Sequence, residues 1–179
     1  MKGQVVHVDN SSITIHEYGK VTKYNHSLSN ILDEFYLVDN FKRYFKYHEY
    51  TQRLMRYGIS SYHIKKGEGF LIADKKVMYR EKEKSPKVLT FVKGSRPLVT
   101  CVKDDVLFYG EYISNPNRRS ISIFSVDKQG NTNTVCIIEG IRHIHAIIPY
   151  SNHFLVTTGD MDNECKLIMV NSNTGLTKE

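Results

Sequence analysis

The feature that most constrains the fold is a series of short apolar segments that repeats along the chain from Arg56 onward. The segments are rich in β-branched and aromatic residues, and Gly, Asn, Asp and Pro separate them, which is typical of short strands joined by turns. They group into units of roughly 45 residues. Two units contain four segments each, and a last unit stops after three, "HAIIPY", "HFLVTTGD" and "KLIMVN". Repeated units of four antiparallel strands are typical of β-propeller blades, so we predict an all-β fold of this kind.

The same periodicity predicts how the chain is organised. Residues 1–40 contain strands that would form part of a first blade. Residues 41–55 carry apolar side chains near helical spacing, which predicts one short amphipathic helix near residues 41–56. Three further ranges are interpreted as blades, the last one incomplete: 56–95, 96–141 and 142–179. We therefore expect a single partial propeller domain of three to four blades, with self-association through open blade edges, because unpaired strand edges attract further strands.

Composition and charge narrow the class of protein. No apolar run approaches the ~18–20 residues that a membrane-spanning helix needs, and no apolar signal segment follows Met1. The net charge of +6 is concentrated in residues 40–100, where it is interpreted as a solvated surface. Cys101, Cys136 and Cys165 are widely spaced among strand-like residues, which favours reduced thiols over disulfides or a zinc site. We expect a cytoplasmic protein with no membrane partner, no nucleic-acid partner and no cofactor.

Two turn sequences recur at an interval of 46 residues: "SVDKQGNT" at 125–132 and "NSNTGLTK" at 171–178. In such turns Asp or Asn side chains accept hydrogen bonds from nearby backbone N–H groups, and glycine supplies the positive φ. Together with "GSRP", "YGEYISNPNRR", "GIRHIH" and "TTGDMDNE", they resemble the sialidase-like, Asp-box (BNR) repeat β-propellers from roughly Arg53 to the end. The resemblance implies a propeller of six blades when complete, of which this chain would be a fragment or a short product.

Charged residues recur at the joints between units. Arg56, Arg96 and Arg142 each precede the first strand of a unit, at intervals of 40 and 46 residues. In a propeller blade, the joint before the first strand and the turn after the second strand reach the same face of the disc. We therefore expect one shared mouth of the central channel to be lined by these residues: Arg56, Arg96, Arg142, His143, His145, Glu111, Asp160, Asp162 and Glu164. The "NPNRR" loop nearby is interpreted as a solvated insertion from which Arg118 and Arg119 could reach a ligand.

These side chains predict a binding site for an anion. A guanidinium group binds a planar carboxylate through two parallel hydrogen bonds, and the family resemblance implies an arginine triad used in this way. The leading hypothesis is a sialidase-like propeller that binds a carbohydrate or another carboxylate-bearing ligand. The ligand-binding candidates are Arg56, Arg96, Arg142, His143, His145 and Glu164. If the protein is an enzyme, glycoside hydrolysis is the expected reaction, with Glu111 and Asp160 as the catalytic carboxylates.

Other interpretations of the same residues remain open. The lack of a complete catalytic set favours a non-catalytic scaffold for protein partners. His143 and His145 lie on the same side of an extended strand and, with Asp160 or Glu164, could hold a divalent metal for a hydrolase or lyase. The main prediction contains no metal. An arginine paired with Glu111 or Asp160 could also simply join neighbouring blades.

Overall fold

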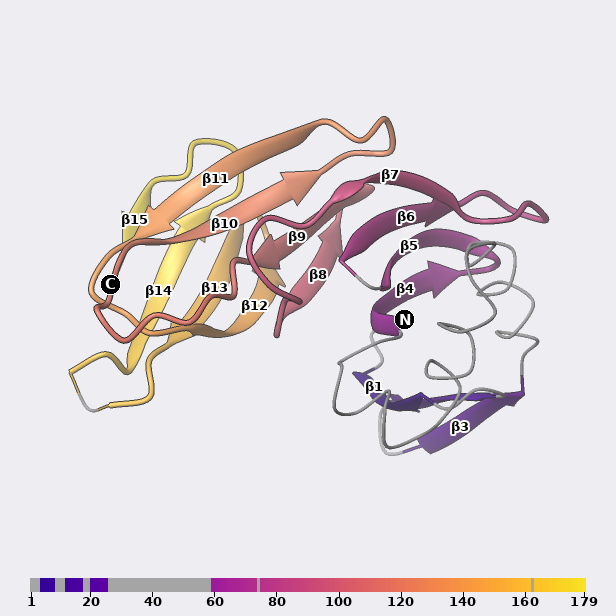
Figure 1. Ribbon diagram of the computed structural model, residues 1–179, viewed down its shortest axis with the longest axis horizontal. Coiled ribbons are helices and arrows are strands. Elements are labelled where there is room, and N and C mark those ends of the chain that lie inside the picture. The colour runs from indigo at the N-terminus through magenta and orange to yellow at the C-terminus, as the bar shows by residue number, and fades with distance from the viewer. Residues whose placement is uncertain (1–3, 9–11, 18–19, 26–58, 74, 162) are drawn as a thin grey trace, which may run out of the picture. The chain divides into compact units, whose positions relative to one another are not determined.

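The computed structural model describes residues 4–8, 12–17, 20–25, 59–73, 75–161 and 163–179 (Figure 1). All of the regular elements in these ranges are strands, so the all-β prediction is confirmed for this part of the chain. The predicted helix near residues 41–56, together with Arg56, lies outside the described residues. Two compact units can be distinguished: Met1–Asp74 with Arg80–Lys87, and Lys75–Tyr79 with Val88–Glu179.

The strands form four sheets, in each of which neighbouring strands are consecutive in sequence. The first sheet contains three strands, β1 (Gln4–Val8), β2 (Ser12–Glu17) and β3 (Lys20–Asn25). The second contains four, β4 (Ile59–Lys65), β5 (Glu68–Ala73), β6 (Lys76–Arg80) and β7 (Lys87–Phe91). The third contains β8 (Thr100–Lys103), β9 (Val106–Gly110), β10 (Ile121–Val126) and β11 (Thr132–Ile138). The fourth contains β12 (Ile144–Tyr150), β13 (His153–Thr158), β14 (Lys166–Asn171) and β15 (Thr177–Lys178).

The fourth sheet corrects one prediction, because the last unit does not stop after three strands. The two residues of β15 pair with Met169 and Val170 of β14, and the backbone N–H of Asn171 donates to the carbonyl of Leu176. A hairpin this short closes because the turn between the strands is tight. The three later sheets therefore have four strands each.

The turns β10–β11 and β14–β15 are each closed by one side-chain oxygen that accepts two backbone N–H groups. Asp127 Oδ1 accepts the backbone N–H groups of Gln129 and Asn131 at 2.9 Å each. Asn171 Oδ1 accepts those of Asn173 and Thr174 at 3.0 Å each. The interval of 46 residues predicts Asn173 at the position of Asp127, but the side chain that accepts the backbone N–H groups is that of Asn171.

A glycine with positive φ completes each of these turns, Gly130 at φ 91° and Gly175 at φ 71°. Each glycine also lies against an outer strand of the preceding sheet. A Cβ atom would come within 2.9 Å of the Leu89 carbonyl oxygen at Gly130, and within 2.0 Å of the Val135 carbonyl oxygen at Gly175. The two turn sequences therefore also pack in the same way: the glycine of each turn contacts the backbone of the preceding sheet.

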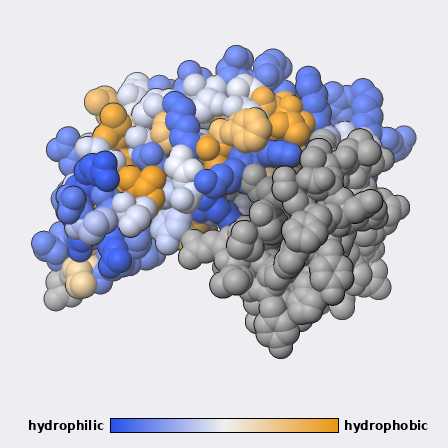
Figure 2. Space-filling view, in the orientation of Figure 1, coloured by the Kyte–Doolittle hydropathy of each residue, from blue (hydrophilic) through white to orange (hydrophobic). Residues whose placement is uncertain are grey.

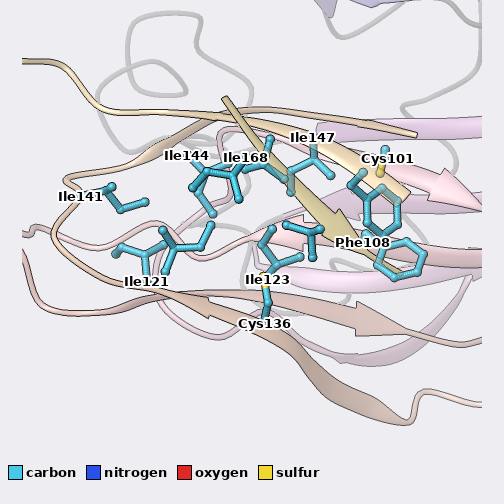
Figure 3. Close-up of a cluster of buried hydrophobic side chains, with 13 residues drawn as sticks. Cys101, Phe108, Ile121, Ile123, Cys136, Ile141, Ile144, Ile147 and Ile168 are labelled. Atoms are coloured by element: carbon cyan, nitrogen blue, oxygen red, sulfur yellow. The ribbon is translucent and has the colours of Figure 1, made fainter. Parts of the chain in front are cut away.

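The main core lies between the sheet β8–β11 and the sheet β12–β15, and Figure 3 shows their isoleucines facing one another. The inward side chains alternate with outward ones along β13 and β14, as a strand with one buried face requires. Within this core Phe108 and Phe154 pack with their ring centroids 4.6 Å apart. The most deeply buried members come from both sheets: Ile121, Ile123, Ile141, Phe154, Val156 and Val170. Strand β12 lies next to β8, so these two sheets meet through their first strands.

The surface away from this core is mainly polar. On the face that Figure 2 shows, apolar side chains form small patches among hydrophilic ones. Among the described residues, no helix offers the length and apolar character that crossing a membrane would require.

Candidate functional site

The candidate site forms where the joint before β12 meets the turn after β13. The backbone N–H of Gly159 donates to the carbonyl of His143 at 3.1 Å, which closes the turn onto the joint. Gly159 has φ 81°, and a Cβ atom there would lie 2.1 Å from the carbonyl carbon of Glu164. Glycine is therefore required both by the backbone conformation and by the close approach of the chain.

A β-bulge directs the second residue of β12 toward the same place. The register with β13 shifts between Ile144, which pairs with Thr158, and Ala146, which pairs with Thr157. His145 is the extra residue, and bulges of this kind re-aim a side chain. An equivalent shift occurs in β4 between Ile59 and Ser61.

Asp160 is the centre of the polar cluster. Its Oδ2 lies 2.9 Å from His143 Nε2 and 3.7 Å from Arg142 Nε, and its Oδ1 lies 2.9 Å from His145 Nε2. The side chains of Arg142, His145 and Asp160 are 43%, 42% and 31% exposed. One carboxylate therefore holds two imidazoles and a guanidinium at the surface, where a solute can reach three of the four groups.

His143 is the most enclosed member of the cluster, with a side chain only 15% exposed. Its ring lies against the ring of Tyr112, with centroids 5.4 Å apart, and edge-on to His145 at 5.9 Å. Within the described part of the chain, its buried Nδ1 has no hydrogen-bond partner. A buried N–H without a partner would be costly, so we assign the neutral tautomer in which Nε2–H donates to Asp160 and Nδ1 carries the lone pair.

Glu164 lies behind this cluster and is almost fully buried. Its Oε1 accepts a hydrogen bond of 2.6 Å from Arg118 Nε, and its Oε2 accepts the backbone N–H of Arg142 at 2.9 Å. The hydrogen bond from Arg118, aided by that from Arg142, lowers the pKa of Glu164 below its ordinary value. The backbone is fixed as well, since Thr158 Oγ1 donates to the Glu164 carbonyl at 2.8 Å.

Arg118 reaches Glu164 from the loop that follows β9. Asn115 organises this loop: its Nδ2 donates to the carbonyls of Arg119 and Ile141, and its Oδ1 accepts the N–H of Arg119. Asn115 is only 2% exposed. The interpretation of "NPNRR" as a solvated insertion is therefore wrong for Asn115 and Arg118, although Arg119 is exposed. In the sequence, an Asn followed by Pro stands between the end of a strand and a pair of arginines, which indicates an ordered turn. This pattern does not indicate that Arg118 pairs with Glu164.

The remaining predicted site residues have separate environments. Glu111 Oε2 accepts the backbone N–H of Ser122 at 3.1 Å, and this bond ties the end of β9 to β10. Arg96 is partly buried in the joint before β8. That joint also meets the turn after its second strand, because Ser95 donates its N–H to the carbonyl of Tyr112 at 2.7 Å.

The structure thus brings together Arg142, His143, His145, Asp160 and Glu164, all of which were singled out from the sequence. Tyr112 and Arg118 join them from the segment between β9 and β10. Arg56 and Asp162 lie outside the described residues. Across the ranges that the structure describes, no group of three or more His, Cys, Asp or Glu side chains has a geometry that could hold a metal ion. No protein-family model matches the sequence, and no curated protein matches it.

Proposed function

We propose that the chain is part of a sialidase-like β-propeller that binds an acidic carbohydrate at the cluster around Asp160. Three features of the fold support a propeller. Strand β12 of the fourth sheet lies next to β8 of the third, and the turns β10–β11 and β14–β15 each place a positive-φ glycine against the preceding sheet. In addition, the joint before the first strand meets the turn after the second in both the third and the fourth sheet.

The observation that carries the ligand proposal is the exposure of opposite hydrogen-bonding groups side by side. Arg142 and His145 offer N–H donors, while Asp160 offers carboxylate oxygens as acceptors. A sugar that bears a carboxylate needs both, since its hydroxyl groups donate to a carboxylate and its own carboxylate accepts from a guanidinium. The 3.7 Å separation between Arg142 and Asp160 leaves the guanidinium loosely held, so a ligand carboxylate can compete for it.

We propose binding without hydrolysis. Glycoside hydrolysis needs two carboxyl groups that flank one bond. Glu164 is enclosed and held by Arg118, and Glu111 is bonded to the backbone of Ser122. Among the candidate carboxylates that the structure describes, Asp160 is then the one that a substrate would meet at the cluster. The non-catalytic interpretation of the repeat is favoured for that reason.

The test is a glycan array that includes uronic and sialic acids, followed by titration calorimetry with the best acidic glycan. Asp160→Asn and Arg142→Gln should each weaken binding by at least about tenfold. Arg119→Gln is the matched control, because Arg119 is an exposed arginine on a neighbouring loop. The proposal fails if no acidic glycan binds, or if Arg142→Gln and Arg119→Gln bind equally well. If the wild type hydrolyses a fluorogenic glycoside and Asp160→Asn does not, the proposal of binding without hydrolysis is wrong and the protein is a glycoside hydrolase.

A further inference from the structure

We propose that the cluster around Asp160 takes up a proton on His145 when it binds an acidic carbohydrate, so that acidification tightens binding. This regulation rests on the proposed function, because it acts on the same site. His143 and His145 both lie within hydrogen-bonding distance of Asp160, but only one of them has surroundings that accept a second proton. The affinity of the site should therefore rise as the pH falls through the range in which imidazole groups titrate, about pH 5 to 8.

His143 is held as a neutral imidazole. Its Nε2 lies 2.9 Å from Asp160 Oδ2, and its buried Nδ1 has no hydrogen-bond partner among the residues that the structure describes. Protonation would place a second N–H on Nδ1, and an N–H that is buried without an acceptor costs free energy. The role of His143 is therefore to hold the carboxylate of Asp160 in position and not to change its own charge.

His145 differs from His143 because it is open to water. Its side chain is 42% exposed, compared with 15% for His143. Its Nε2 lies 2.9 Å from Asp160 Oδ1. A protonated ring keeps this hydrogen bond and adds a positive charge to it, which makes the bond to the carboxylate stronger. Water can accept the added N–H of a side chain that is exposed to this extent.

The charges around His145 decide how a ligand affects its proton. They come from the joint before β12, the turn after β13 and the segment between β9 and β10. The charged and titratable residues are Arg142 and His143 in the joint, Asp160 and Glu164 in the turn, and Tyr112 and Arg118 in the segment. Arg118 neutralises Glu164, and Arg142 neutralises Asp160, so the cluster has no net charge while both imidazoles are neutral. A proton on His145 makes the site cationic, and the carboxylate of a ligand then balances this charge.

The same proton also makes Arg142 available to the ligand. Arg142 Nε lies 3.7 Å from Asp160 Oδ2, farther than the 2.9 Å that separates each imidazole from this carboxylate. Once His145 is an imidazolium, Asp160 has a closer counter-charge, and the guanidinium is free to pair with a ligand carboxylate. Protonation and ligand binding then favour each other by the same factor, as linkage requires.

The expected effect is moderate because the charged groups are partly exposed. One additional charge at such a site changes an affinity by about fivefold. We therefore expect acidic glycans to bind about fivefold more tightly at about pH 5.5 than at about pH 7.5. His63 does not contribute in this window, because burial lowers its pKa to about 4.

The experiment is titration calorimetry of the full chain with the methyl glycosides of glucuronic acid and N-acetylneuraminic acid, at about pH 5.5 and about pH 7.5. A titration at about pH 6.5 is repeated in two buffers that differ in ionisation enthalpy, and the difference in heat gives the number of protons taken up. The wild type should bind about fivefold more tightly at the lower pH and take up a fraction of a proton.

Three substitutions locate the proton. His145→Gln keeps a polar side chain that does not titrate, so its affinity should be the same at both pH values. His143→Gln should weaken binding at both pH values, because Asp160 loses one of its partners, but it should keep the fivefold ratio. The matched control is His153→Gln at the opposite end of β13, which should behave as the wild type does. Circular dichroism checks the fold of all three variants.

Nitrogen-15 NMR of the histidine rings supplies a measurement that needs no ligand. In the free protein, His143 should remain the neutral Nε2–H tautomer at both pH values, while His145 gains a second proton between them. Protonation of His143 instead of His145 would overturn the proposal.

The calorimetry separates this regulation from the proposed function. Equal wild-type affinities at the two pH values, or a fivefold ratio that persists in His145→Gln, would overturn the regulation and leave acidic-glycan binding intact. If neither glycoside binds at either pH, the proposed function and its regulation are both wrong.

Discussion

Arg118 and Glu164 are joined across 46 residues of chain by a hydrogen bond of 2.6 Å between Nε and Oε1. The carboxylate of Glu164 is 5% exposed and the guanidinium side chain of Arg118 is 32% exposed. Through its other oxygen, Glu164 accepts a hydrogen bond from the backbone N–H of Arg142, in the joint before β12. One side chain thereby connects the loop after β9, the joint before β12 and the turn after β13.

The first prediction concerns the charge of Glu164. Glu164→Gln keeps the shape of the side chain but removes the charge that Arg118 meets, so we expect the melting temperature at pH 7 to fall by several degrees. The pKa of Glu164 is lowered in the folded protein, so its stabilising contribution is complete above the ordinary glutamate value of about 4.3. It is lost as the pH falls through the lowered value. The difference between wild type and variant should therefore shrink in acid, which calorimetry at pH 7 and about pH 3 will measure.

The control for this substitution is Glu139→Gln, a change of the same kind at an exposed position between β11 and β12. It should leave the melting temperature at pH 7 nearly unchanged. Equal melting temperatures for Glu164→Gln and the wild type at pH 7 would show that the bond to Arg118 does not stabilise the fold.

The second prediction separates crowding from backbone strain at two glycines. Gly159 and Gly140 both have positive φ, 81° and 69°, but a Cβ atom would clash with the Glu164 backbone at Gly159 and meet nothing within 4 Å at Gly140. Gly140→Ala should cost about 1 kcal/mol, the penalty of a left-handed alanine. Gly159→Ala should cost more than about 3 kcal/mol, because the turn must also open. Denaturant unfolding measures both, and similar losses for the two variants would contradict the close approach.

The strands and their grouping could be predicted because the signals are local. The run "HFLVTT" of β13 is rich in β-branched and aromatic residues and is bounded by turn residues, which predicts a strand, and the structure buries Phe154 and Val156 on its core face. The meeting of Arg142, His143 and His145 with Asp160 and Glu164 also followed from repetition. It requires only that each joint and the turn after the second strand lie at the same end of a sheet.

The partners of individual side chains could not be predicted in this way. Arg118 finds Glu164 because Asn115 folds its loop onto the Ile141 carbonyl, and such a bond depends on where two distant backbones meet. The acceptor in the last turn was misassigned for a related reason. The loop that leads to Gly175 is one residue longer than the loop that leads to Gly130, so Asn171 rather than Asn173 faces the backbone N–H groups.

The third prediction concerns the three cysteines. Burial raises the pKa of Cys101 to about 12 and that of Cys136 to about 11, while Cys165 is exposed. Because only a thiolate reacts with iodoacetamide, native protein at pH 8 should gain one adduct, at Cys165. Unfolded protein should gain three. Mass spectrometry of digested samples identifies the sites, with Cys165→Ser as the control that gains none in the native state. Rapid native labelling of Cys101 or Cys136 would contradict the packing of the core.

The fourth prediction concerns His63 on β4, where burial lowers the pKa to about 4 from the ordinary 6.5. The unfolded chain takes up a proton on this residue below about pH 6.5, whereas the folded protein does so only below about pH 4. The contribution of neutral His63 to stability is therefore complete above pH 6.5, and it falls as the pH decreases, by about 2 kcal/mol at pH 5. His63→Leu should remove this part of the pH dependence, which urea unfolding at pH 7.5 and pH 5 measures. An NMR titration of the His63 ring with a midpoint near 6.5 would contradict the burial that the structure assigns to it.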